Sequence, residues 1–449
     1  MSIVVNKKKN IAIIGAGAAG LVAAFYALEG GNSVTVFEKN DIAGKKLRIT
    51  GNGRCNFTNE DINVSHYAHG SDTGFIDSVL KKNGKDELIA FLDLCGIPSF
   101  QKNGYYYPLS ERAGEVTDLL VNVLTRKGAI IRFGEDFHEI LRNTDATYNL
   151  NGEKYDVLIL ACGGKAAPAT GSDGSGFKLA RSFGHTVSFT YPVLVPLKVD
   201  QKILKEISGV RIKAKAYGIV DDEIVSFDRG EIQFTDTAIS GIPVFQISRH
   251  LTKAIEEKKD VRIRLDALPD VASEQVEEFV SKRTENYRKN SLNNMAVTGS
   301  LKELFEGIFP KKYYEFLLNQ FILMQRFKPQ INNQSYSLED YNKTEQVNTA
   351  KKESVSESGI EFVRFIKNFE FIITGHAGYE NAQCTRGGVL LSEMKDTLES
   401  EKTPNLYIIG EMLDVDGECG GYNLQWAFSS GILVGRSVAD AFTREKGKN

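Results

Sequence analysis

The sequence has few prolines, few histidines and no excess of positive charge. Its 449 residues include 10 Pro and 6 His, and 55 Lys and Arg stand against 58 Asp and Glu, for a formal net charge of −3. With 42% apolar and 25% charged residues, this composition excludes disordered, fibrous and disulfide-scaffold classes. A chain without a basic field has no general attraction for phosphate backbones, so we expect no nucleic-acid partner.

Cysteine is also scarce, and its spacing gives no sign of a metal site. The five residues Cys55, Cys95, Cys162, Cys384 and Cys419 are odd in number and widely spaced. No C-x-x-C pair occurs, and no grouping with histidine resembles a zinc site. The plain interpretation is a set of reduced thiols in a cytoplasmic protein without a metal.

Long apolar runs are nearly absent. Lys7-Lys8-Lys9 followed by the stretch from Ile11 to Leu28 imitates a signal peptide or membrane anchor. Three glycines interrupt that stretch, and its first five residues are typical of a buried strand rather than a lipid-facing helix. We therefore predict no membrane span.

The chain does contain an α/β pattern at both ends and a different pattern between them. Strand and helix signals alternate over residues 1–190 and return over 369–449. Residues 191–270 are typical of β structure, and 271–368 of helices with a polar excursion near 332–358. At this length two or three domains are expected. We predict an α/β, Rossmann-like fold in two chain segments, interrupted by an insert whose β part is a small barrel or a curved sheet and whose other part is helical.

The individual elements are predicted from periodicity. The opening is a βαβ unit, with strands at 11–14 and 34–37 around a helix at 18–28. The polar stretch 41–59 is predicted as loop, and 74–94 and 113–126 as helical. In the insert, strands are predicted at 194–199, 210–220, 224–227, 232–234 and 261–265, and helices within 271–342.

The first chemical motif is the loop of the βαβ unit, Gly15-Ala16-Gly17-Ala18-Ala19-Gly20, with Glu38 at the end of the second strand. Gly15 permits a tight turn, Gly17 lets the backbone approach a pyrophosphate, and Gly20 lets helix and strand pack closely. The helix N-terminus supplies N–H donors, and Glu38 accepts hydrogen bonds from a ribose diol. The motif predicts a bound dinucleotide, either FAD or NAD.

Two later segments favour FAD. An apolar strand ends at Gly410-Glu411, and Gly417 to Asn423 precede a helix from about Leu424. In flavoproteins the strand-end acid can bind a ribitol hydroxyl, and a helix N-terminus aimed at the flavin pyrimidine stabilises the anionic reduced ring. A second buried strand, Tyr155 to Leu160, runs into Ala161-Cys162-Gly163-Gly164 and is similar to the nucleotide-side strand of two-lobed FAD proteins. Its alternative is an ordinary core strand with a glycine turn.

Four stretches resemble one bacterial flavoprotein family. The run GKKLRITGNGRCNFTN from Gly44 to Asn59 is similar to its marker, and the others are Tyr191–Leu197, Ala382–Val389 and Gly410–Ala427. The family is that of the YhiN-like and BaiN-like FAD-dependent oxidoreductases, which includes aminoacetone oxidase and a bile-acid enone reductase. The resemblance implies a discontinuous FAD domain with a β-barrel and helical insert. It is weakest inside the insert, where Asp236 stands in place of an expected His.

The motifs and the resemblance together define a candidate FAD site. In the marker run, Lys46, Arg48 and Arg54 either neutralise the pyrophosphate, lie beside flavin N1 and O2, or belong to a solvated basic loop. The predicted FAD-binding residues are Gly15, Gly17, Ala18, Ala19, Gly20, Glu38, Lys39, Gly44, Lys46, Leu47, Thr50, Gly51, Gly53, Arg54, Cys55, Asn56, Ala161, Cys162, Gly163, Gly164, Gly410, Glu411, Gly421, Tyr422, Asn423 and Leu424.

Catalytic residues are harder to predict. Arg54, Cys55 and Tyr422 are weak candidates because they belong to loops expected at the flavin edge. Cys55 with Cys419 would allow a rival dithiol mechanism, although the C-x-x-x-x-C pattern of such enzymes is missing and a packing role is the alternative. His376 is the histidine nearest to an expected active-site loop, with a hydrogen-bonded structural role as its alternative. No Ser-His-Asp arrangement is visible.

The predicted function is that of an FAD-dependent oxidoreductase moving hydride between flavin N5 and a small organic substrate. Because only one dinucleotide motif is present, NAD(P)H is expected as a transient electron donor. We favour reduction of a conjugated C=C or C=N bond, with substrate identity set by the insert and the flavin edge. A flavin amine oxidase using oxygen and a non-catalytic FAD-binding sensor stay open as alternatives. The oligomeric state is open as well.

Overall fold

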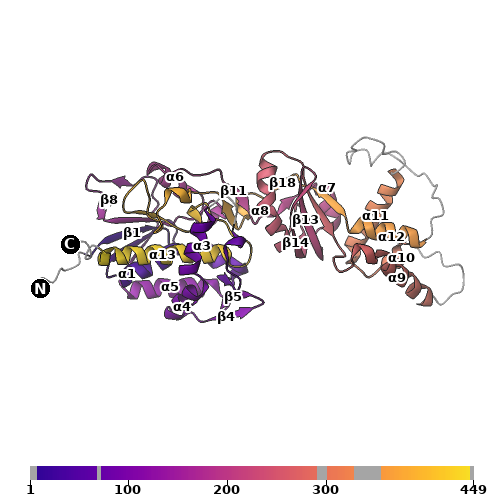
Figure 1. Ribbon diagram of the computed structural model, residues 1–449, viewed down its shortest axis with the longest axis horizontal. Helices are drawn as coiled ribbons and strands as arrows, with labels where there is room; N and C mark the ends of the chain where they lie inside the picture. Colours follow the sequence, from indigo (N-terminus) through magenta and orange to yellow (C-terminus); the bar gives the residue numbers. More distant parts are fainter. Residues whose placement is uncertain (1–7, 68–71, 291–300, 328–354, 445–449) are drawn as a thin grey trace. The chain divides into compact units, whose positions relative to one another are not determined.

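The computed structural model describes residues 8–67, 72–290, 301–327 and 355–444, which form two compact units. The first unit consists of Met1–Val195 and Gly378–Asn449, and the second of Pro196–Ala377. Figure 1 shows the elements of each unit along the chain. The first unit is therefore built from both ends of the sequence, and each unit is described below by itself.

A five-stranded parallel sheet forms the centre of the first unit. Its strand order is β20-β10-β1-β2-β6, and every neighbouring pair is parallel. Ile14 lies opposite both Leu160 and Phe37 in the register. Both faces of such a sheet are covered, which is why its central strands are runs of buried aliphatic residues. The predicted Rossmann-like fold in two chain segments is confirmed. The strands are β1 (Asn10–Ile14), β2 (Ser33–Glu38), β6 (Ile130–Phe133), β10 (Val157–Leu160) and β20 (Leu406–Ile408).

The C-terminal helix packs along the first helix of the chain (Figure 1). The two helices are α1 (Ala18–Glu29) and α13 (Tyr422–Arg444). A Cβ on Gly431 would lie 2.5 Å from the Ala19 carbonyl oxygen, and one on Gly435 would lie 2.8 Å from that of Ala23. Because both positions are glycine, the two backbones approach closely, and this contact joins the two segments of the first unit.

The region after β2 is more regular than expected. The stretch 41–59, predicted as loop, contains two short helical turns and a strand, so that prediction was wrong. Residues with left-handed backbone, Gly44 before the first turn and Gly51 within the second, let the chain reverse tightly. The helical signal at 74–94 is two helices that meet at Asn83-Gly84, and the helix at 113–126 is confirmed. The elements are α2 (Lys45–Ile49), η1 (Thr50–Gly53), β3 (Thr58–Asn59), α3 (Thr73–Lys82), α4 (Lys85–Leu94) and α5 (Ala113–Arg126).

The described part of the first unit also contains three small antiparallel sheets and a further α-helix, α6. The sheets have the orders β3-β5-β4, β7-β8-β9 and β11-β19. Because β11 pairs with β19, residues 191–193, expected in the insert, lie in the first unit. The elements are β4 (Ser99–Lys102), β5 (Tyr105–Pro108), β7 (Leu141–Arg142), β8 (Tyr148–Leu150), β9 (Glu153–Tyr155), α6 (Ser175–Ser182), β11 (Tyr191–Val193) and β19 (Cys384–Arg386).

The second unit contains an antiparallel sheet that closes on itself. Its strand order is β17-β16-β13-β14-β15-β12-β18, and β17 and β18 follow each other in one extended segment. In that segment Ile373 N–H donates to the Val261 carbonyl of β16, and Thr374 N–H donates to the Lys198 carbonyl of β12. The two ends of the sheet thus join, which makes the predicted β-barrel. The strands are β12 (Leu197–Lys198), β13 (Arg211–Val220), β14 (Glu223–Phe234), β15 (Ala238–Ser240), β16 (Val261–Asp266), β17 (Phe369–Ile372) and β18 (Gly375–His376).

Two helices of the barrel region were not predicted, α7 (Gln201–Ile207) and α8 (Ile242–Glu256). α8 buries Val244, Ile247 and Leu251 while it packs on β13 and β14. These residues follow helical spacing, but the short run lies between strand signals that dominated the β interpretation. β14 is also one strand, where two had been expected at 224–227 and 232–234.

In the described part of the second unit, four α-helices follow the barrel strands and share a core with the barrel. They are α9 (Val276–Asn290), α10 (Leu301–Phe305), α11 (Lys311–Phe327) and α12 (Val355–Ile366). A buried ion pair ties the end of α12 to the barrel, with Lys367 Nζ 2.7 Å from the Asp266 carboxylate. Of the polar excursion expected at 332–358, residues 332–354 lie outside the described ones. Residues 355–358 begin α12, so that part of the expectation was wrong.

Candidate active site

Two glycines shape the loop between β1 and α1. Gly15 has a φ of +109°, and a Cβ there would collide with the Ala161 carbonyl oxygen at the end of β10. A Cβ on Gly20 would collide with the Gly15 carbonyl oxygen. Because neither position has room for a side chain, the loop, α1 and β10 stay in close contact.

Gly17 differs from these glycines because it faces open space. Its backbone is extended, with φ −84° and ψ −174°, and nothing outside its own stretch of chain lies within 4 Å of a Cβ built there. Gly17 is also the N-cap of α1, where no side chain accepts a hydrogen bond from the first turn. The N–H groups of Ala18 and Ala19 therefore present the positive end of the helix dipole to a space with room for an anion.

Glu38 borders the same loop from the end of β2. Its carboxylate accepts hydrogen bonds from Ala16 N–H at 2.9 Å and from two N–H groups of Asn40 at 2.9 and 2.6 Å. A carboxylate has about four acceptor positions, so three bonds leave one for a ribose hydroxyl. Lys39, also predicted to bind the cofactor, pairs with Asp173 at 2.7 Å. Burial alone would raise the pKa of Asp173. Hydrogen bonds, first from Lys39, have the larger combined effect and lower this pKa from 3.8 to about 2.

The turn after β10 lies against the closing segment of the chain. In this turn Gly163 has a φ of +77°, and a Cβ on Gly164 would lie 2.5 Å from Thr385 Oγ1 and 2.9 Å from Glu411 Oε1. Cys162 points inward, with its Sγ 3.6 Å from a β1 carbonyl, and burial raises its pKa to about 12. A raised pKa favours the protonated form of this thiol at neutral pH.

Glu411 connects three distant parts of the sequence. Its carboxylate accepts hydrogen bonds from Thr385 N–H at 2.9 Å and from Lys46 Nζ at 2.6 Å. The side chains of Lys46 and Glu411 are 26% and 17% exposed, so the pair is partly open to a ligand. A Cβ on Gly410 would lie 3.1 Å from Ala19 Cβ, which places the end of β20 on the first turn of α1. Four predicted residues thus lie together, while Thr385 was not predicted.

The marker run forms a loop with unusual backbone. φ is positive at Gly51 (57°), Asn52 (56°), Gly53 (81°) and Cys55 (60°), and Cys55 N–H donates to the Thr50 carbonyl at 3.0 Å. Left-handed conformations are unfavourable for residues other than glycine and persist where the surroundings enforce them. Arg54, with a φ of −95°, is the one right-handed residue among them, and its N–H donates to the Gly51 carbonyl at 3.2 Å, so these two hydrogen bonds close the loop on itself.

Other predicted residues of the marker run hold the loop in place. Gly44, with a φ of +64°, is the N-cap of α2, and Leu47 is buried. Thr50 Oγ1 donates to the Leu47 carbonyl at 2.7 Å. Asn56 Nδ2 donates to backbone carbonyls of β3 and β5, both at 3.0 Å. These contacts anchor the loop on both sides.

The N-terminus of α13 is packed against β3. Gly421 has a φ of +99°, and a Cβ there would lie 2.6 Å from the Thr58 carbonyl oxygen. The side-chain amide of Asn423 stabilises the preceding turn. It accepts a hydrogen bond from Gly417 N–H at 2.8 Å and donates one to the Gly417 carbonyl at 2.9 Å. Leu424 packs on the core of the first unit. The start of the helix is therefore rigidly placed.

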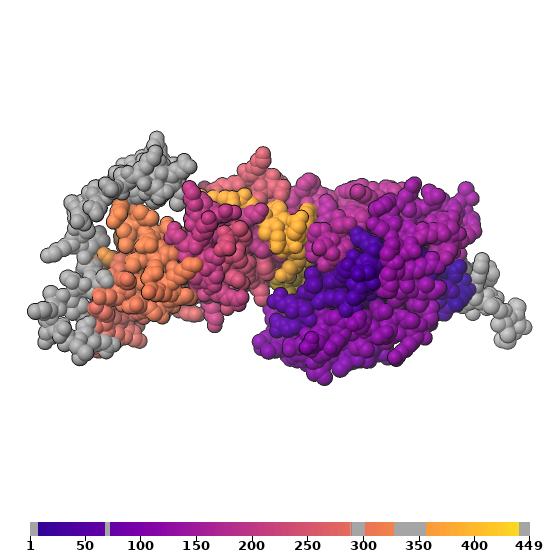
Figure 2. Space-filling model, turned by 180° about the vertical axis from the view of Figure 1, so that it is seen from behind, coloured from indigo at the N-terminus to yellow at the C-terminus, as the bar shows by residue number. Residues whose placement is uncertain are grey.

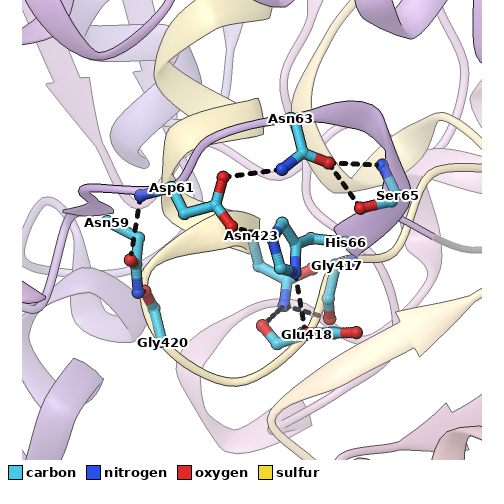
Figure 3. A network of polar contacts seen from close by, with 9 residues as sticks. All are labelled: Asn59, Asp61, Asn63, Ser65, His66, Gly417, Glu418, Gly420 and Asn423. Carbon is cyan, nitrogen blue, oxygen red and sulfur yellow. Dashed lines mark hydrogen bonds and ion pairs between the residues drawn. The ribbon is translucent and has the colours of Figure 1, made fainter. Parts of the chain in front are cut away.

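His66 connects the segment after the marker run to this helix (Figure 3). Its ring stacks on that of Tyr422, with centroids 4.4 Å apart and an angle of 23° between the planes. Its Nδ1 lies 3.0 Å from the Glu418 carboxylate and its Nε2 lies 3.1 Å from that of Asp61. The hydrogen bond from His66 lowers the pKa of Asp61. Sequence reasoning missed His66 because its partner Glu418 is 352 residues away and no local motif marks it.

The three weak catalytic candidates have different surroundings. Arg54 is exposed, with its Cζ 5.5 Å above the centre of the Tyr107 ring. Cys55 is fully buried, and burial raises its pKa to about 12. Tyr422 is 5% exposed, and burial raises its pKa as well. All five cysteines, Cys419 included, are free thiols. A buried, protonated Cys55 favours packing over the dithiol mechanism.

A Ser-His-Glu arrangement lies elsewhere in the first unit. His185 Nε2 is 2.7 Å from Ser400 Oγ, and His185 Nδ1 is 2.9 Å from the Glu393 carboxylate. Ser400 Oγ also accepts N–H bonds from Lys402 and Thr403, and the residue is 1% exposed. The Ser400 hydroxyl is fully hydrogen-bonded and shielded from solvent. The network therefore stabilises the turn at Ser400–Thr403, and Ser400 is not placed to act as a nucleophile. The sequence had shown no such arrangement because its members are 208 and 215 residues apart.

Two insert residues singled out in the sequence lie in the second unit. His376, in β18, has its Nε2 2.7 Å from the Glu256 carboxylate of α8, which is the hydrogen-bonded structural role given as its alternative. Asp236 is exposed between β14 and β15.

The residues of the first unit fit FAD. A Cβ at Gly17 would enter the space beside the N-terminus of α1, Glu38 keeps an acceptor position, and Lys46 with Glu411 supplies a partly open charge pair at the end of β20. In open parallel sheets, ligands bind at the carboxyl ends of the strands, where these residues lie. Fold and site define an FAD-dependent oxidoreductase with a two-segment Rossmann domain.

The chain belongs to the family of HI0933-like proteins with a Rossmann domain, whose model matches residues 9–437. It is 38% identical over 436 residues, 96% of this chain and 99% of the relative, to a 3-dehydro-bile acid delta(4,6)-reductase of Clostridium scindens. It is 28% identical over 439 residues, 95% of this chain and 98% of the relative, to a ribosomal RNA dihydrouridine synthase of Haemophilus influenzae. The resemblance stated from the marker run is confirmed.

A solved structure shares the fold. The chain is 11% identical to a 3-ketosteroid delta1-dehydrogenase of Sterolibacterium denitrificans, with a TM-score of 0.50 and coverage of 97% of this chain and 100% of that one. Among the helices that the structure describes, none combines the length and the apolar character needed to cross a membrane.

Proposed function

We propose that the protein reduces a C=C bond conjugated to a carbonyl group, with electrons that NAD(P)H delivers through FAD. The observation that carries this proposal is the similarity to the delta(4,6)-reductase, at 38% identity over 96% of the chain. That alignment includes both units, so it covers the cofactor site and the insert alike. A cytoplasmic location, expected from the reduced cysteines, is part of the proposal.

The proposed reaction assigns one role to FAD and others to the residues of the protein. Reduction of such a bond adds a hydride to the β-carbon and a proton to the α-carbon, while NAD(P)H is oxidised to NAD(P)⁺. FAD supplies the hydride when it is bound. The first turn of α1 binds the pyrophosphate, Glu38 the ribose, and Lys46 with Glu411 the ribitol or the flavin pyrimidine edge. What the protein must add is polarisation of the carbonyl and a path for the proton.

Arg54 and Tyr422 suit these tasks better than Cys55. A guanidinium stays charged and donates hydrogen bonds, so Arg54 is suited to polarise a carbonyl oxygen. Burial raises the pKa of Tyr422, which keeps its hydroxyl protonated, but the residue is only 5% exposed, so Arg54 is the more accessible of the two. The Cys55 thiol is buried and has no opening toward a substrate.

Uracil in RNA is the second candidate substrate. Relatives from Haemophilus influenzae and Escherichia coli, each 28% identical over more than 90% of this chain, are named ribosomal RNA dihydrouridine synthases. The C5=C6 bond of uracil is conjugated to a carbonyl, so the same addition of hydride and proton applies. The net charge of −3 argues against nucleic acid only as an average over the chain. The absence of a nucleic-acid partner stays a prediction.

Anaerobic stopped-flow absorbance separates the candidates. FAD-loaded protein is mixed with NADH or NADPH, and a steroid 4-en-3-one or a uridine-containing RNA is added next. We expect the flavin band to bleach with a nicotinamide and to recover with one of the two acceptors. Bleaching by an amine with recovery only by oxygen would identify an amine oxidase. A flavin that no reductant bleaches would identify a sensor.

A further inference from the structure

Three polar side chains of the first unit meet at one hydroxyl group. Lys165 follows the turn after β10, Thr190 precedes β11, and Tyr379 begins the short helix η7 (Tyr379–Asn381). Lys165 Nζ donates to Thr190 Oγ1 at 2.8 Å, and Tyr379 Oη donates to the same atom at 3.0 Å. Lys165 Nζ also lies 5.6 Å from the centroid of the Tyr379 ring. These three residues are called the Lys165 cluster.

The backbone and the lysine stem hold the Lys165 cluster in place. The N–H groups of Lys165 and of the next residue both donate to Thr385 Oγ1, at 2.8 and 3.0 Å. Ala167 N–H donates to the Tyr379 carbonyl at 2.8 Å, and its φ of +57° is one that persists only where the surroundings enforce it. A Cβ on Gly174 would lie 2.8 Å from Lys165 Cγ, so the lysine stem occupies the space that a side chain there would need. The ammonium group therefore has a defined position.

The Lys165 cluster has hydrogen-bond donors left over at its centre. A hydroxyl oxygen accepts two hydrogen bonds, and those from Lys165 and Tyr379 fill both positions of Thr190. An ammonium group has three N–H donors, of which Thr190 binds one. In the part of the chain that the structure describes, two N–H groups of Lys165 and the hydroxyl proton of Thr190 thus have no acceptor. All three residues are partly exposed, and Figure 2 shows orange-yellow atoms at the surface where the bar places residues 370–400, the part of the chain that includes Tyr379.

The charge of Lys165 has no carboxylate partner among the described residues. The segments around it contain Asp173, Glu380 and Glu411. Asp173 and Glu411 form ion pairs with other lysines, and Glu380 is exposed and forms none with Lys165. The face of the Tyr379 ring attracts the ammonium group but carries no net charge. A held, partly exposed cation with unused donors therefore lacks the negative charge that would complete it.

We propose that the Lys165 cluster is a binding site for an oxyanion, that is, a phosphate or carboxylate group. Such a group offers only acceptors and a negative charge, and its hydrogen bonds to an ammonium group are charge-assisted. Thr385 connects the site to the cofactor residues, because its Oγ1 binds the turn of Lys165 and its N–H binds Glu411. The phosphate of a visiting nicotinamide dinucleotide and the carboxylate of an acidic substrate share this chemistry. The proposal goes beyond the proposed function, since reduction of a C=C bond does not itself require an anion site.

The test measures anion binding by the full-length, FAD-loaded protein. Sodium phosphate and sodium acetate are titrated separately by calorimetry, with chloride keeping the ionic strength constant, into the wild type, Lys165→Met and Thr190→Val. We expect the wild type to bind at least one of the two anions. Lys165→Met should weaken this binding about tenfold, because a charged donor is lost, and Thr190→Val about threefold, because a neutral donor is lost. The control is Lys154→Met, whose exposed lysine pairs with Asp145, and flavin content and melting temperature verify that each variant folds.

Two further measurements identify the source of the anion. If Lys165→Met needs more NADH or NADPH to bleach the flavin but binds the steroid enone unchanged, the site holds a phosphate of the nicotinamide dinucleotide. If Lys165→Met instead loses a preference of the wild type for a steroid enone carboxylic acid over its methyl ester, the site holds the carboxylate of the substrate.

Other outcomes overturn the proposal. Binding of neither anion by the FAD-loaded wild type does so, and so does equal binding by Lys165→Met and Lys154→Met. Binding by the apoprotein alone also overturns it, because the donors would then belong to the FAD site. The anion titrations need no turnover, so a flavin that never bleaches removes the proposed function and leaves the oxyanion site in place.

Discussion

Lys46 Nζ lies 2.6 Å from the Glu411 carboxylate, although 365 residues separate the two in the sequence. The pair holds the marker run against the end of β20, beside the Thr385 amide that the same carboxylate binds. Both side chains are partly exposed, and such ion pairs contribute only about 0–1 kcal/mol to stability. Its position next to the cofactor site therefore matters more than its strength.

The first prediction follows from this pair. Lys46→Ala should weaken FAD binding at least tenfold, because a positive charge beside the ribitol and pyrimidine edge is lost, while the melting temperature of the apoprotein changes little. FAD titration of the apoprotein by flavin fluorescence measures the effect. The control is Lys45→Ala, whose lysine pairs with the exposed Asp41. Equal FAD affinity in the two variants would contradict the assignment.

The second prediction concerns Gly17. Its extended backbone accepts a valine without strain, so Gly17→Val should fold normally while its side chain fills the space before the α1 N-terminus. The variant should purify colourless, judged by the ratio of flavin to protein absorbance. Gly375→Val is the control, since a Cβ there meets only the Lys198 side chain at 3.8 Å. A yellow Gly17→Val protein with full FAD content would refute the site.

Local patterns predicted the nucleotide-binding half of the site, and contacts between distant residues account for what was missed. The βαβ opening spans the 29 residues Asn10–Glu38, and its glycine spacing and aliphatic runs are both typical of a nucleotide-binding unit. Thr385, His66 and the His185 network have no such local mark, because each contributes through a partner more than 25 residues away. Contacts between residues so far apart in the sequence leave no periodic pattern by which they could be predicted.

The marker run shows a second limit of pattern reasoning. Its polar composition suggested a loop and gave no sign of the short turns within 45–53, which depend on left-handed backbone at Gly51 and Asn52. In the barrel the strands were predictable from alternation. Alternation left a small barrel and a curved sheet both open, because closure depends on residues 373 and 374 donating to two different strands.

The third prediction distinguishes packing from redox chemistry at Cys55. Cys55→Ser should keep FAD and most of the turnover, within about threefold, because a fully buried thiol with a pKa of about 12 supplies no thiolate. NAD(P)H-dependent turnover and flavin content are measured together. Cys419→Ser, which changes the more exposed thiol, serves as the comparison. Complete loss of turnover with FAD retained would revive the dithiol mechanism.

The fourth prediction concerns the electron donor. Because the chain has one dinucleotide motif, NAD(P)H should bind the FAD-loaded protein weakly, with a Kd above micromolar, and leave after delivering hydride. Calorimetric titration with NADH and NADPH, using the redox-inactive NAD⁺ and NADP⁺ as controls, measures this affinity. A stoichiometric submicromolar site would mean that the chain holds a nicotinamide site of its own.

The fifth prediction is a pH dependence of stability from His185 and Glu393. Burial lowers the pKa of His185 below its usual 6.5 despite the neighbouring carboxylate. Burial opposes ionisation of Glu393, but hydrogen bonding, first from Lys402, brings its pKa to about 2 from 4.5. Both pKa values are lower in the folded state, so the unfolded state binds more protons as the pH falls. The stability that they contribute is complete above pH 6.5.

Acidification should therefore remove this stability in two stages. The His185 contribution is lost as the pH falls below 6.5, and that of Glu393 between 4.5 and about 2. His185→Gln should be less stable at pH 8 by about 1–3 kcal/mol, because buried partners lose their hydrogen bonds. It should also show a flatter dependence between pH 7 and 5, measured by urea unfolding. His138→Gln, at a histidine whose side chain is 82% exposed, should match the wild type. A wild-type slope in His185→Gln would mean that other groups govern the acid sensitivity.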